Sequence, residues 1–455
     1  MVRFSVMAMR ISEMRLHPIA IADAPLRSSY GLHAPYALRT IVELKTTDGL
    51  TGIAETYGGE RPLAALQAAS QHVTGMDPFQ LTRFWQSLNA EHAGEHPSDS
   101  SDVAGGRSQT YLVPGENPLD QHTRTFAAIE IACLDVIGKA LGKPLCDLAG
   151  GRARDEAPFS AYLFYKHGGG GGLGEDQRED EYGEALDPAS IVRQARQMIA
   201  KYGFSEIKLK GGVLHPKFEI ASIQALRAEF GPRFPLRIDP NCAWSVDASV
   251  QVGEALREEL SGLGYLEDPA ATLPGMAEVR RRLLAAKIQT PLASNVAVTT
   301  FDQVVEAQRL DAVQIVLSDP HYWGGLRNQQ RLSHLCHVLG LGVSMHSNNH
   351  LGISMMAMAH AAAASEHLTH ACDTHYPWQT DKDEVVAGGR VPIRNGKVTL
   401  SKTAPGLGVE LDYDQLARGR ERYDRLPYRK RDDEAEMQGR IDPSWRRVVP
   451  QWDTL

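Results

Sequence analysis

The sequence predicts a (β/α)8-type (TIM-like) barrel with an α+β capping domain formed by the N-terminal third and the C-terminal tail. The barrel prediction rests on stretches that share one design, a few apolar residues followed by polar ones. Their starts lie about 20 to 30 residues apart, room for a strand, a loop, a helix and a return loop. These stretches are Ile207–Lys210, Leu236–Asn241, Tyr265–Asp268, Pro291–Asn295, Val313–Ile315 with the later Asp319, and Val343–His346. The strand ends of a closed barrel face one site, so these polar groups should meet there.

The remaining elements divide the chain into three parts, predicted at residues 1–155, 156–400 and 401–455. Alternating apolar residues on both sides of Asp48-Gly49 predict a hairpin over 39–57. Apolar residues at helical spacing predict a helix from Phe126 to Leu141. The repeat should begin with a strand at Phe159–Tyr165 and end with one at His370–Asp373. After Gly406 the sequence is charged and helical through Tyr428, and we expect an irregular tail beyond it.

Composition excludes several classes of protein. The 455 residues are 42% hydrophobic and 23% charged, as in soluble globular proteins, and the net charge of −8 argues against nucleic acid as a partner. The five cysteines are dispersed and never form a CxxC pair, which argues against a structural zinc site and against a disulfide framework. This cysteine usage suits a cytoplasmic protein. The N-terminus does not resemble a secretory signal. The alanine-rich stretch Ile353–Ala364 is too short to span a membrane and is predicted to be a buried barrel helix.

Two segments read as insertions. Residues 100–122 are rich in Ser, Gly and Pro, and residues 167–184 hold the run Gly168–Gly172 followed by an acidic stretch. This glycine run lacks the pattern of a phosphate-binding P-loop. We expect a mobile solvated loop at 167–184. Because it follows the first barrel strand, it could instead cover the pocket.

A metal site is predicted from Asp239, Glu267 and Asn295, which stand at the ends of three consecutive predicted strands, about 28 residues apart. A single such carboxylate could merely end a strand or cap a helix. Three in series favour a cation site, because two carboxylates and an amide supply the hard oxygen ligands that Mg²⁺ prefers.

Proton-transfer groups are predicted on either side of that series. Lys208 and Lys210 point to the same face of one strand, and crowding of two ammonium groups can lower a lysine pKa until the group acts as a base. A solvated surface strand would also carry such a pair, but both faces of a barrel strand are buried. His346 ends another predicted strand, and Asp319 could hydrogen-bond its far ring nitrogen and fix its tautomer.

The order of these residues resembles the enolase superfamily, in particular its mandelate racemase-like branch, and more narrowly the glucarate dehydratase family. The resemblance rests on Asn as the third metal ligand and on similar stretches, which run from residue 23 to past residue 410, nearly the whole chain. They include Gly31–Tyr36, Lys208–Val213, Asp239–Asn241, Ala243–Ser245, Asp319–His321, His346–His350, Asp373–His375 and Pro405–Glu410.

The resemblance implies Mg²⁺-dependent dehydration of a six-carbon dicarboxylate sugar acid. In that reaction Lys210 would remove the proton next to a carboxylate, and Lys208 would help to lower its pKa. His346, oriented by Asp319, would protonate the departing hydroxyl, and Asn241 would steady the ene-diolate. Candidate substrate-binding residues by position in matching motifs are His33, Thr110, Ser347, Asn348, His375 and Arg431. A homo-oligomer is the habit of the superfamily.

Alternatives remain at this level. Ser28 stands where that family more often has Asn, so the preferred stereoisomer could differ, and a dehydratase or epimerase for galactarate or idarate is the nearest rival. A non-catalytic relative that keeps only the fold is another. Arg431 lies in the charged run Tyr428–Asp433, which could simply be solvated.

Overall fold

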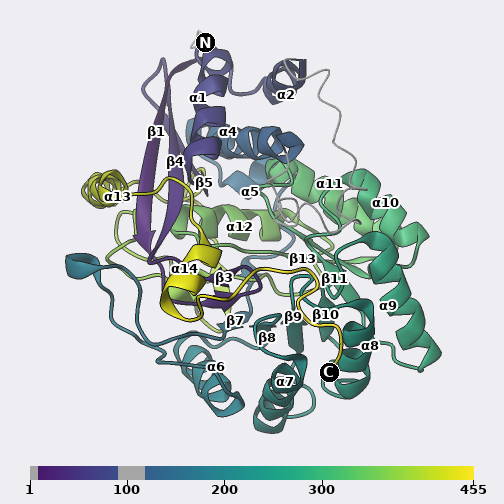
Figure 1. Ribbon diagram of the computed structural model, residues 1–455. Coiled ribbons are helices and arrows are strands. Elements are labelled where there is room, and N and C mark those ends of the chain that lie inside the picture. Colours follow the sequence, from purple (N-terminus) through teal and green to yellow (C-terminus); the bar gives the residue numbers. More distant parts are fainter. Residues whose placement is uncertain (1–8, 91–117) are drawn as a thin grey trace.

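The cap begins with a three-stranded antiparallel sheet. The computed structural model describes residues 9–90 and 118–455 (Figure 1). The strands β1 (Ile11–Ala22), β4 (Tyr36–Thr46) and β5 (Thr51–Tyr57) lie in the order β1-β4-β5. The predicted hairpin is confirmed, because β4 and β5 pair from Arg39–Tyr57 to Lys45–Thr51, with Gly49 at φ +87° in the turn. A small hairpin of β2 (Arg27–Ser28) and β3 (Gly31–Leu32) follows β1.

Helices pack on one face of this sheet. Those in contact with the strands are α1 (Glu60–Val73) and α4 (Pro118–Leu141), while α2 (Leu81–Ala90) and the short α5 (Leu145–Leu148) pack against α4. The predicted helix 126–141 is confirmed as part of α4, which starts eight residues earlier, at Pro118, is buried from Phe126 to Gly138 and packs on β5. Glycine is required at Gly52 of β5, since a Cβ there would lie 2.1 Å from the Ala132 carbonyl oxygen of α4.

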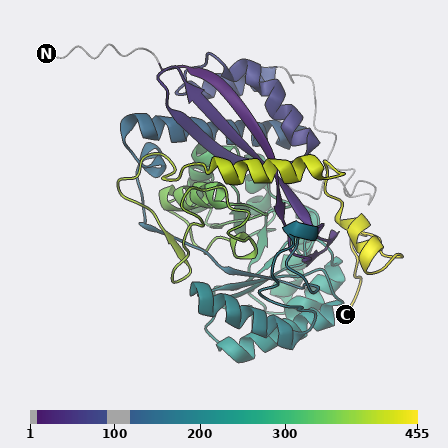
Figure 2. The same ribbon diagram turned by 90° about the vertical axis from the view of Figure 1, so that its left-hand side faces the viewer.

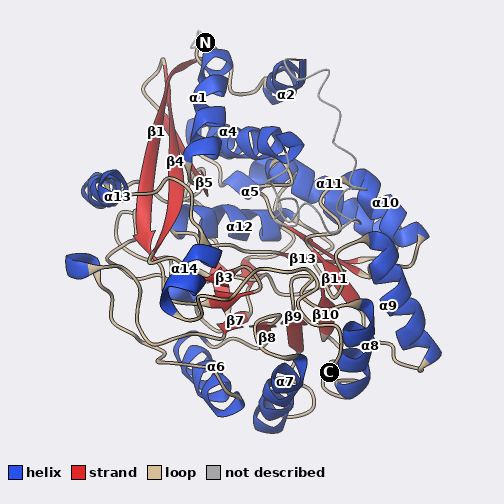
Figure 3. Ribbon diagram, viewed as in Figure 1, coloured by secondary structure: helices blue, strands red, loops and turns tan. Residues whose placement is uncertain are grey.

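Seven parallel strands form the second sheet, and they neighbour one another in chain order. The strands are β7 (Ala161–Phe164), β8 (Ile207–Lys210), β9 (Leu236–Asp239), β10 (Tyr265–Glu267), β11 (Leu292–Ser294), β12 (Ile315–Ser318) and β13 (Gly342–Met345). Between them run α6 (Pro188–Tyr202), α7 (Pro216–Phe230), α8 (Val246–Ala255), α9 (Leu273–Ala285), α10 (Phe301–Arg309) and α11 (Gly325–Val338), and α12 (Gly352–Ala364) follows β13. Figure 3 shows these helices outside the curled sheet.

The segment 369–373 joins the two edge strands of this sheet. Thr369 N and Asp373 N donate to the carbonyls of Val343 and Met345 on the β13 side, at 3.0 and 2.8 Å. Cys372 N donates to Pro158 O at 2.9 Å, and Ser160 N donates to Cys372 O at 2.8 Å, at the start of β7. The predicted last strand is therefore in place, although it forms only an isolated bridge between Phe159 and Cys372.

The alanine-rich stretch is the buried barrel helix that the sequence predicts. All residues of α12 are buried, and they pack between the barrel and the cap strand β5. Among the described residues, no helix is both long and apolar enough to cross a membrane.

The C-terminal part returns to the cap after β14 (Lys397–Thr399), which pairs with β6 (Glu156–Pro158). The helix α13 (Tyr413–Arg425) lies across the cap sheet and contacts β1 (Figure 2). The expectation of an irregular tail after Tyr428 is wrong in part. A further helix, α14 (Asp433–Arg440), forms there because the Asp432 side chain caps it by accepting from Ala435 N, and Met437 is buried. The last residues reach the barrel, where Trp452 N donates to Ala243 O at 3.0 Å.

The glycine-rich acidic segment 167–184 is held to the cap at Gly171 and Arg178, so the expectation of a solvated loop is wrong there, although the residues around Glu175 are exposed. Arg178 is 7% exposed, and its Nε and Nη2 each donate to the Asp383 carboxylate at 2.8 Å. The same carboxylate accepts from Ala22 N of β1 at 3.3 Å. A Cβ at Gly171 would lie 2.2 Å from Asp23 O, so only glycine allows this approach. The segment therefore links the barrel to the cap strand that ends at Ala22.

We expect Arg178→Met to lower the free energy of unfolding by about 3 kcal/mol, because it leaves the buried Asp383 carboxylate with a weaker set of partners. Arg422 Nη2, 3.1 Å from Asp383 Oδ1, keeps the loss at the lower end of the range for a broken buried pair. Urea denaturation measures it. Lys201→Met is the matched control, because the Lys201–Glu181 pair is 44% and 48% exposed and should contribute under about 1 kcal/mol. Equal losses in the two variants would contradict a role of Arg178 in holding this segment.

Candidate functional site

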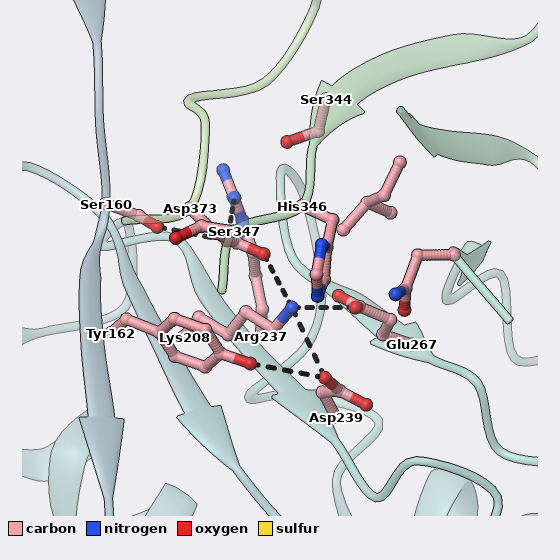
Figure 4. Close-up of polar contacts among 12 residues, drawn as sticks. Ser160, Tyr162, Lys208, Arg237, Asp239, Glu267, Ser344, His346, Ser347 and Asp373 are labelled. Carbon is pink, nitrogen blue, oxygen red and sulfur yellow. Dashed lines mark hydrogen bonds and ion pairs between the residues drawn. The ribbon is translucent and has the colours of Figure 1, made fainter. Parts of the chain in front are cut away.

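The polar groups predicted to converge do so at the carboxyl ends of the barrel strands. Figure 4 shows Lys208 of β8, Asp239 of β9, Glu267 of β10 and His346, which follows β13, pointing into one space. All four side chains are buried or nearly so, with His346 13% exposed. Parallel strands in chain order bring residues distant in sequence to one end of the sheet, which is why the predicted spacing translates into a single site.

A cluster of carboxylates lies at the centre. Oxygen atoms of Asp239, Glu267 and Asp268 lie within 4.8 Å of one another. Asp268 was not among the predicted ligands. Its oxygens accept hydrogen bonds from Ser294 Oγ at 2.5 Å and from Asn295 N at 3.1 Å, so it also holds the end of β11 against β10. Burial and the nearby charge of Asp239 raise the pKa of Asp268 to about 6.

The donor set fits a hard divalent cation. Glu267 Oε2 is buried and has no hydrogen-bond partner among the described residues. The Asn295 amide oxygen faces only acceptors; with the amide reversed, its nitrogen would donate to Asp268 Oδ2 at 2.7 Å and to Glu267 Oε1 at 3.2 Å. In either orientation the Asn295 amide lies beside the two carboxylates, so its oxygen is placed to join theirs around a cation. Burial and the charge of Asp239 raise the pKa of Glu267 well above its usual range, so the ionised cluster requires positive charge.

Two lysines supply part of that charge from β8, and both lie inside the barrel as their spacing predicts. Lys208 Nζ lies 2.6 Å from Glu267 Oε1, 2.6 Å from Asp373 Oδ2 and 3.3 Å from Asp239 Oδ2. Burial alone would lower the pKa of Lys208, but these carboxylates, Asp373 foremost, raise it well above its usual range. Lys210 Nζ lies 2.6 Å from Asp239 Oδ2. A lowering of the Lys210 pKa by Lys208 stays a prediction.

Asn241 fixes the other oxygen of Asp239. Its backbone N–H and its side-chain Nδ2 both lie 2.9 Å from Asp239 Oδ1. Asn241 has φ +45°, a left-handed conformation that Asn tolerates better than most residues. Asp239 is thus oriented by Asn241 on one oxygen and by Lys210 on the other, and these contacts keep the pKa of Asp239 below its usual value in spite of burial.

The predicted contact between Asp319 and His346 is present. His346 Nδ1 lies 3.3 Å from Asp319 Oδ2. Burial lowers the pKa of His346, and the hydrogen bond and charge of Asp319 oppose that effect. Asp319 has two further partners that the sequence did not indicate, His321 and Tyr57 of the cap strand β5.

The predicted substrate-binding residues form two groups. Ser347, which follows β13, has its Oγ 3.0 Å from Nδ1 of His375, which follows the segment 369–373. His33 of the cap and Arg431 of the tail share Asp23 Oδ2, at 3.0 Å from His33 Nδ1 and 2.9 Å from Arg431 Nη1. The reading of Arg431 as a solvated charge is therefore wrong.

Two further candidates remain. Asn348 is half-buried, and its Oδ1 accepts from Asn349 N at 2.7 Å. Thr110 lies outside the described residues.

Several neighbours of the site were missed by sequence reasoning. Tyr162 of β7 lies with its hydroxyl 3.5 Å from Asp239 Oδ2 and its ring 4.8 Å from Lys208 Nζ. Asp373 ends the segment that joins the two edge strands, and its position at a predicted strand end was a usable signal. Asp23 offered none, because its three partners His33, Asn349 and Arg431 are brought to it only by the fold.

Comparison with known proteins places this geometry in a family. Residues 190–416 match the model "Enolase C-terminal domain-like". The chain is 46% identical, over 97% of its length and 99% of the other, to a protein named "Probable glucarate dehydratase" from Streptomyces coelicolor. It also resembles the structure of an enolase from Pseudomonas fluorescens with bound magnesium, potassium and tartrate, with 44% identity, a TM-score of 0.89 and coverage of 98% and 99% of the two chains. It resembles, too, the structure of an enolase from Thermobispora bispora in complex with magnesium and formate. The identity is 45%, the TM-score is 0.85, and the match covers 98% of this chain and 100% of the other. The chain belongs to the enolase superfamily, within which it groups with a dehydratase of acid sugars.

Proposed function

We propose that this protein is a Mg²⁺-dependent hydro-lyase that dehydrates D-glucarate to 5-dehydro-4-deoxy-D-glucarate. The observation that carries the proposal is the placement of two different proton-transfer groups around one carboxylate and amide cluster. Lys210 comes from β8 and His346 from the end of β13, so they approach the cluster from different sides of the ring. The similarity to a probable glucarate dehydratase supports the choice of substrate.

The chemistry needs both groups. A proton next to a carboxylate is too weakly acidic for an unaided amine, so the charge that develops must be stabilised as the proton leaves. Asp239, Glu267 and Asn295 would hold Mg²⁺, which when bound supplies positive charge beside the substrate carboxylate. Lys210 Nζ removes the proton, and Asn241 and Lys208 keep Asp239 and Glu267 in place. His346 then gives a proton to the β-hydroxyl as the C–O bond breaks, and water leaves.

The first test is a substrate panel. Purified protein with Mg²⁺ should consume D-glucarate, with the 2-oxo product followed by NMR, and should act more slowly on galactarate and idarate. Lys210→Ala should stop deuterium exchange at the reacting carbon of D-glucarate, while His346 should still exchange the proton of the epimer at that carbon.

Normal exchange of both epimers in Lys210→Ala would show that Lys210 is not the base. Faster turnover of galactarate or idarate than of D-glucarate would keep the reaction class and change the substrate. No turnover of any acid sugar would favour a non-catalytic relative.

The metal assignment is tested by Asp239→Asn. Removal of a group that only supports a metal ligand typically lowers metal affinity by about 10–100-fold. Loss of the charge of a ligand itself should therefore weaken Mg²⁺ binding by about a hundredfold or more. Isothermal titration with Mg²⁺ measures this in the absence of substrate. Glu219→Gln is the matched control, because Glu219 is a buried carboxylate that accepts from Gly212 N, Val213 N and Leu214 N away from the cluster. Unchanged Mg²⁺ affinity in Asp239→Asn would exclude this carboxylate as a ligand.

Arg431 is proposed to bind the distal carboxylate of the substrate together with His33. Its guanidinium now pairs with Asp433 through Nε and Nη2, at 2.9 and 3.0 Å, and with Asp23 through Nη1. Arg431→Lys loses the planar fork, so kcat/KM for D-glucarate should fall by about 10–100-fold while Mg²⁺ affinity stays unchanged. Arg429→Lys is the control, because Arg429 Nη1 donates to backbone carbonyls of Leu426 and Tyr428. Equal, near wild-type behaviour of both variants would mean that the distal carboxylate is held elsewhere.

A further inference from the structure

Asp319 is shared by two histidines, and each of its oxygens has its own set of donors. Oδ1 accepts from His321 N at 2.7 Å and lies 2.5 Å from His321 Nδ1. Oδ2 lies 3.3 Å from His346 Nδ1 and accepts from Tyr57 OH at 3.2 Å. The carboxylate is buried, so its orientation is decided by these four contacts. The two shortest both come from His321.

His321 is itself held by a chain of donors that begins in the cap. Its Nε2 lies 2.8 Å from Ser354 Oγ of α12, and Arg39 Nη2 of β4 donates to the same Oγ at 3.3 Å. Arg39 can only donate, so Ser354 Oγ accepts from it and has its own proton and a second lone pair left for the contact with His321 Nε2. The Asp319 carboxylate can only accept, so His321 Nδ1, 2.5 Å from Oδ1, carries a ring proton and donates to it.

The orientation of Asp319 in turn determines the tautomer of His346. An Asp319 carboxylate whose Oδ1 is occupied presents Oδ2 to His346, which donates from Nδ1 and leaves Nε2 as the nitrogen that takes up or releases the reacting proton. Tyr57 supports this orientation from the cap, and its ring is covered by the Arg124 guanidinium at 4.1 Å. Both cap strands β4 and β5 therefore contribute a donor to the arrangement around Asp319.

We propose that His321 is a positioning residue for the His346 side of the reaction. It turns Asp319 so that the tautomer and direction of His346 are fixed, and the chain through Ser354 and Arg39 makes this depend on a docked cap. The inference rests on the proposed function, because the reaction assigns work to His346, but the ring geometry can be measured without substrate.

The experiment compares His321→Leu with His321→Asn. Leu removes both ring contacts, whereas an Asn amide can still donate from near the position of Nδ1. Groups that orient a metal-ligating imidazole typically contribute about 10–100-fold, and we expect a similar factor for His346. In His321→Leu we expect deuterium exchange of the epimer handled by His346 to fall by that factor. Exchange of D-glucarate by Lys210 should stay within about threefold of wild type, and His321→Asn should recover most of the loss. Ser354→Ala should show a smaller change of the same kind.

A control separates positioning from damage to the fold. His360 of α12 is equally buried, but its ring contacts Cys146 N and Leu407 O, away from the site. His360→Leu should lower stability without changing the ratio of the two exchange rates. If His321→Leu lowers both rates equally, or neither, the proposal is overturned.

A measurement without substrate distinguishes this outcome from a failure of the proposed function. Ring ¹⁵N shifts of His346, assigned with His346→Asn, should report a proton on Nδ1 in the wild type and a mixture of tautomers in His321→Leu. That result would support the positioning role even if the wild type turned over no aldarate. The same Nδ1–H signal in both proteins would refute the positioning role, whatever the activity.

Discussion

The ammonium group of Lys208 holds together three carboxylates that come from different parts of the barrel. Glu267 ends β10, Asp239 ends β9, and Asp373 lies in the segment between β13 and β7, and all three lie within 3.3 Å of Lys208 Nζ. Each of these groups is fully buried, where an isolated charge would be costly. Lys208 therefore makes it possible to collect acidic groups at the centre of the site, and its short strand β8 also carries Lys210 to the same place.

The backbone turns sharply where the strands deliver these groups. Asn241, Cys242 and Asp268 have φ of +45°, +63° and +39°, in the left-handed region that is costly for residues other than glycine. The strained turns hold one another, because Cys242 N donates to Asp268 O at 2.8 Å and Asp268 N donates to Ala293 O at 2.9 Å. The strain is thus compensated by neighbouring strands, and it allows Asp239 and Asp268 to face the centre directly after short strands.

The cap and the barrel depend on each other through buried polar contacts. Arg178 of the glycine-rich segment reaches the end of β1 through Asp383, and the following residue, Asp23, holds His33 and Arg431. The insertion after β7 therefore packs against the residue that holds the two cap side chains proposed to recognise the far end of the substrate. The cap also reaches Asp319 through Tyr57.

The sequence by itself determined the barrel, the cap hairpin and the convergence of Lys208, Lys210, Asp239, Glu267, Asn295 and His346. This was possible because a parallel strand–helix repeat brings the carboxyl ends of all its strands to one face of the barrel. The position of a residue within its repeat therefore shows whether its side chain lies at that face. The part played by Asp23, the second histidine on Asp319, the anchoring of the glycine-rich segment and the helix α14 were decided by tertiary structure. These features depend on contacts between segments far apart in the chain, such as Asp23 with Arg431 or Arg39 with Ser354. No local pattern or period records which partner a buried polar group will meet, because that is settled only when the cap docks on the barrel.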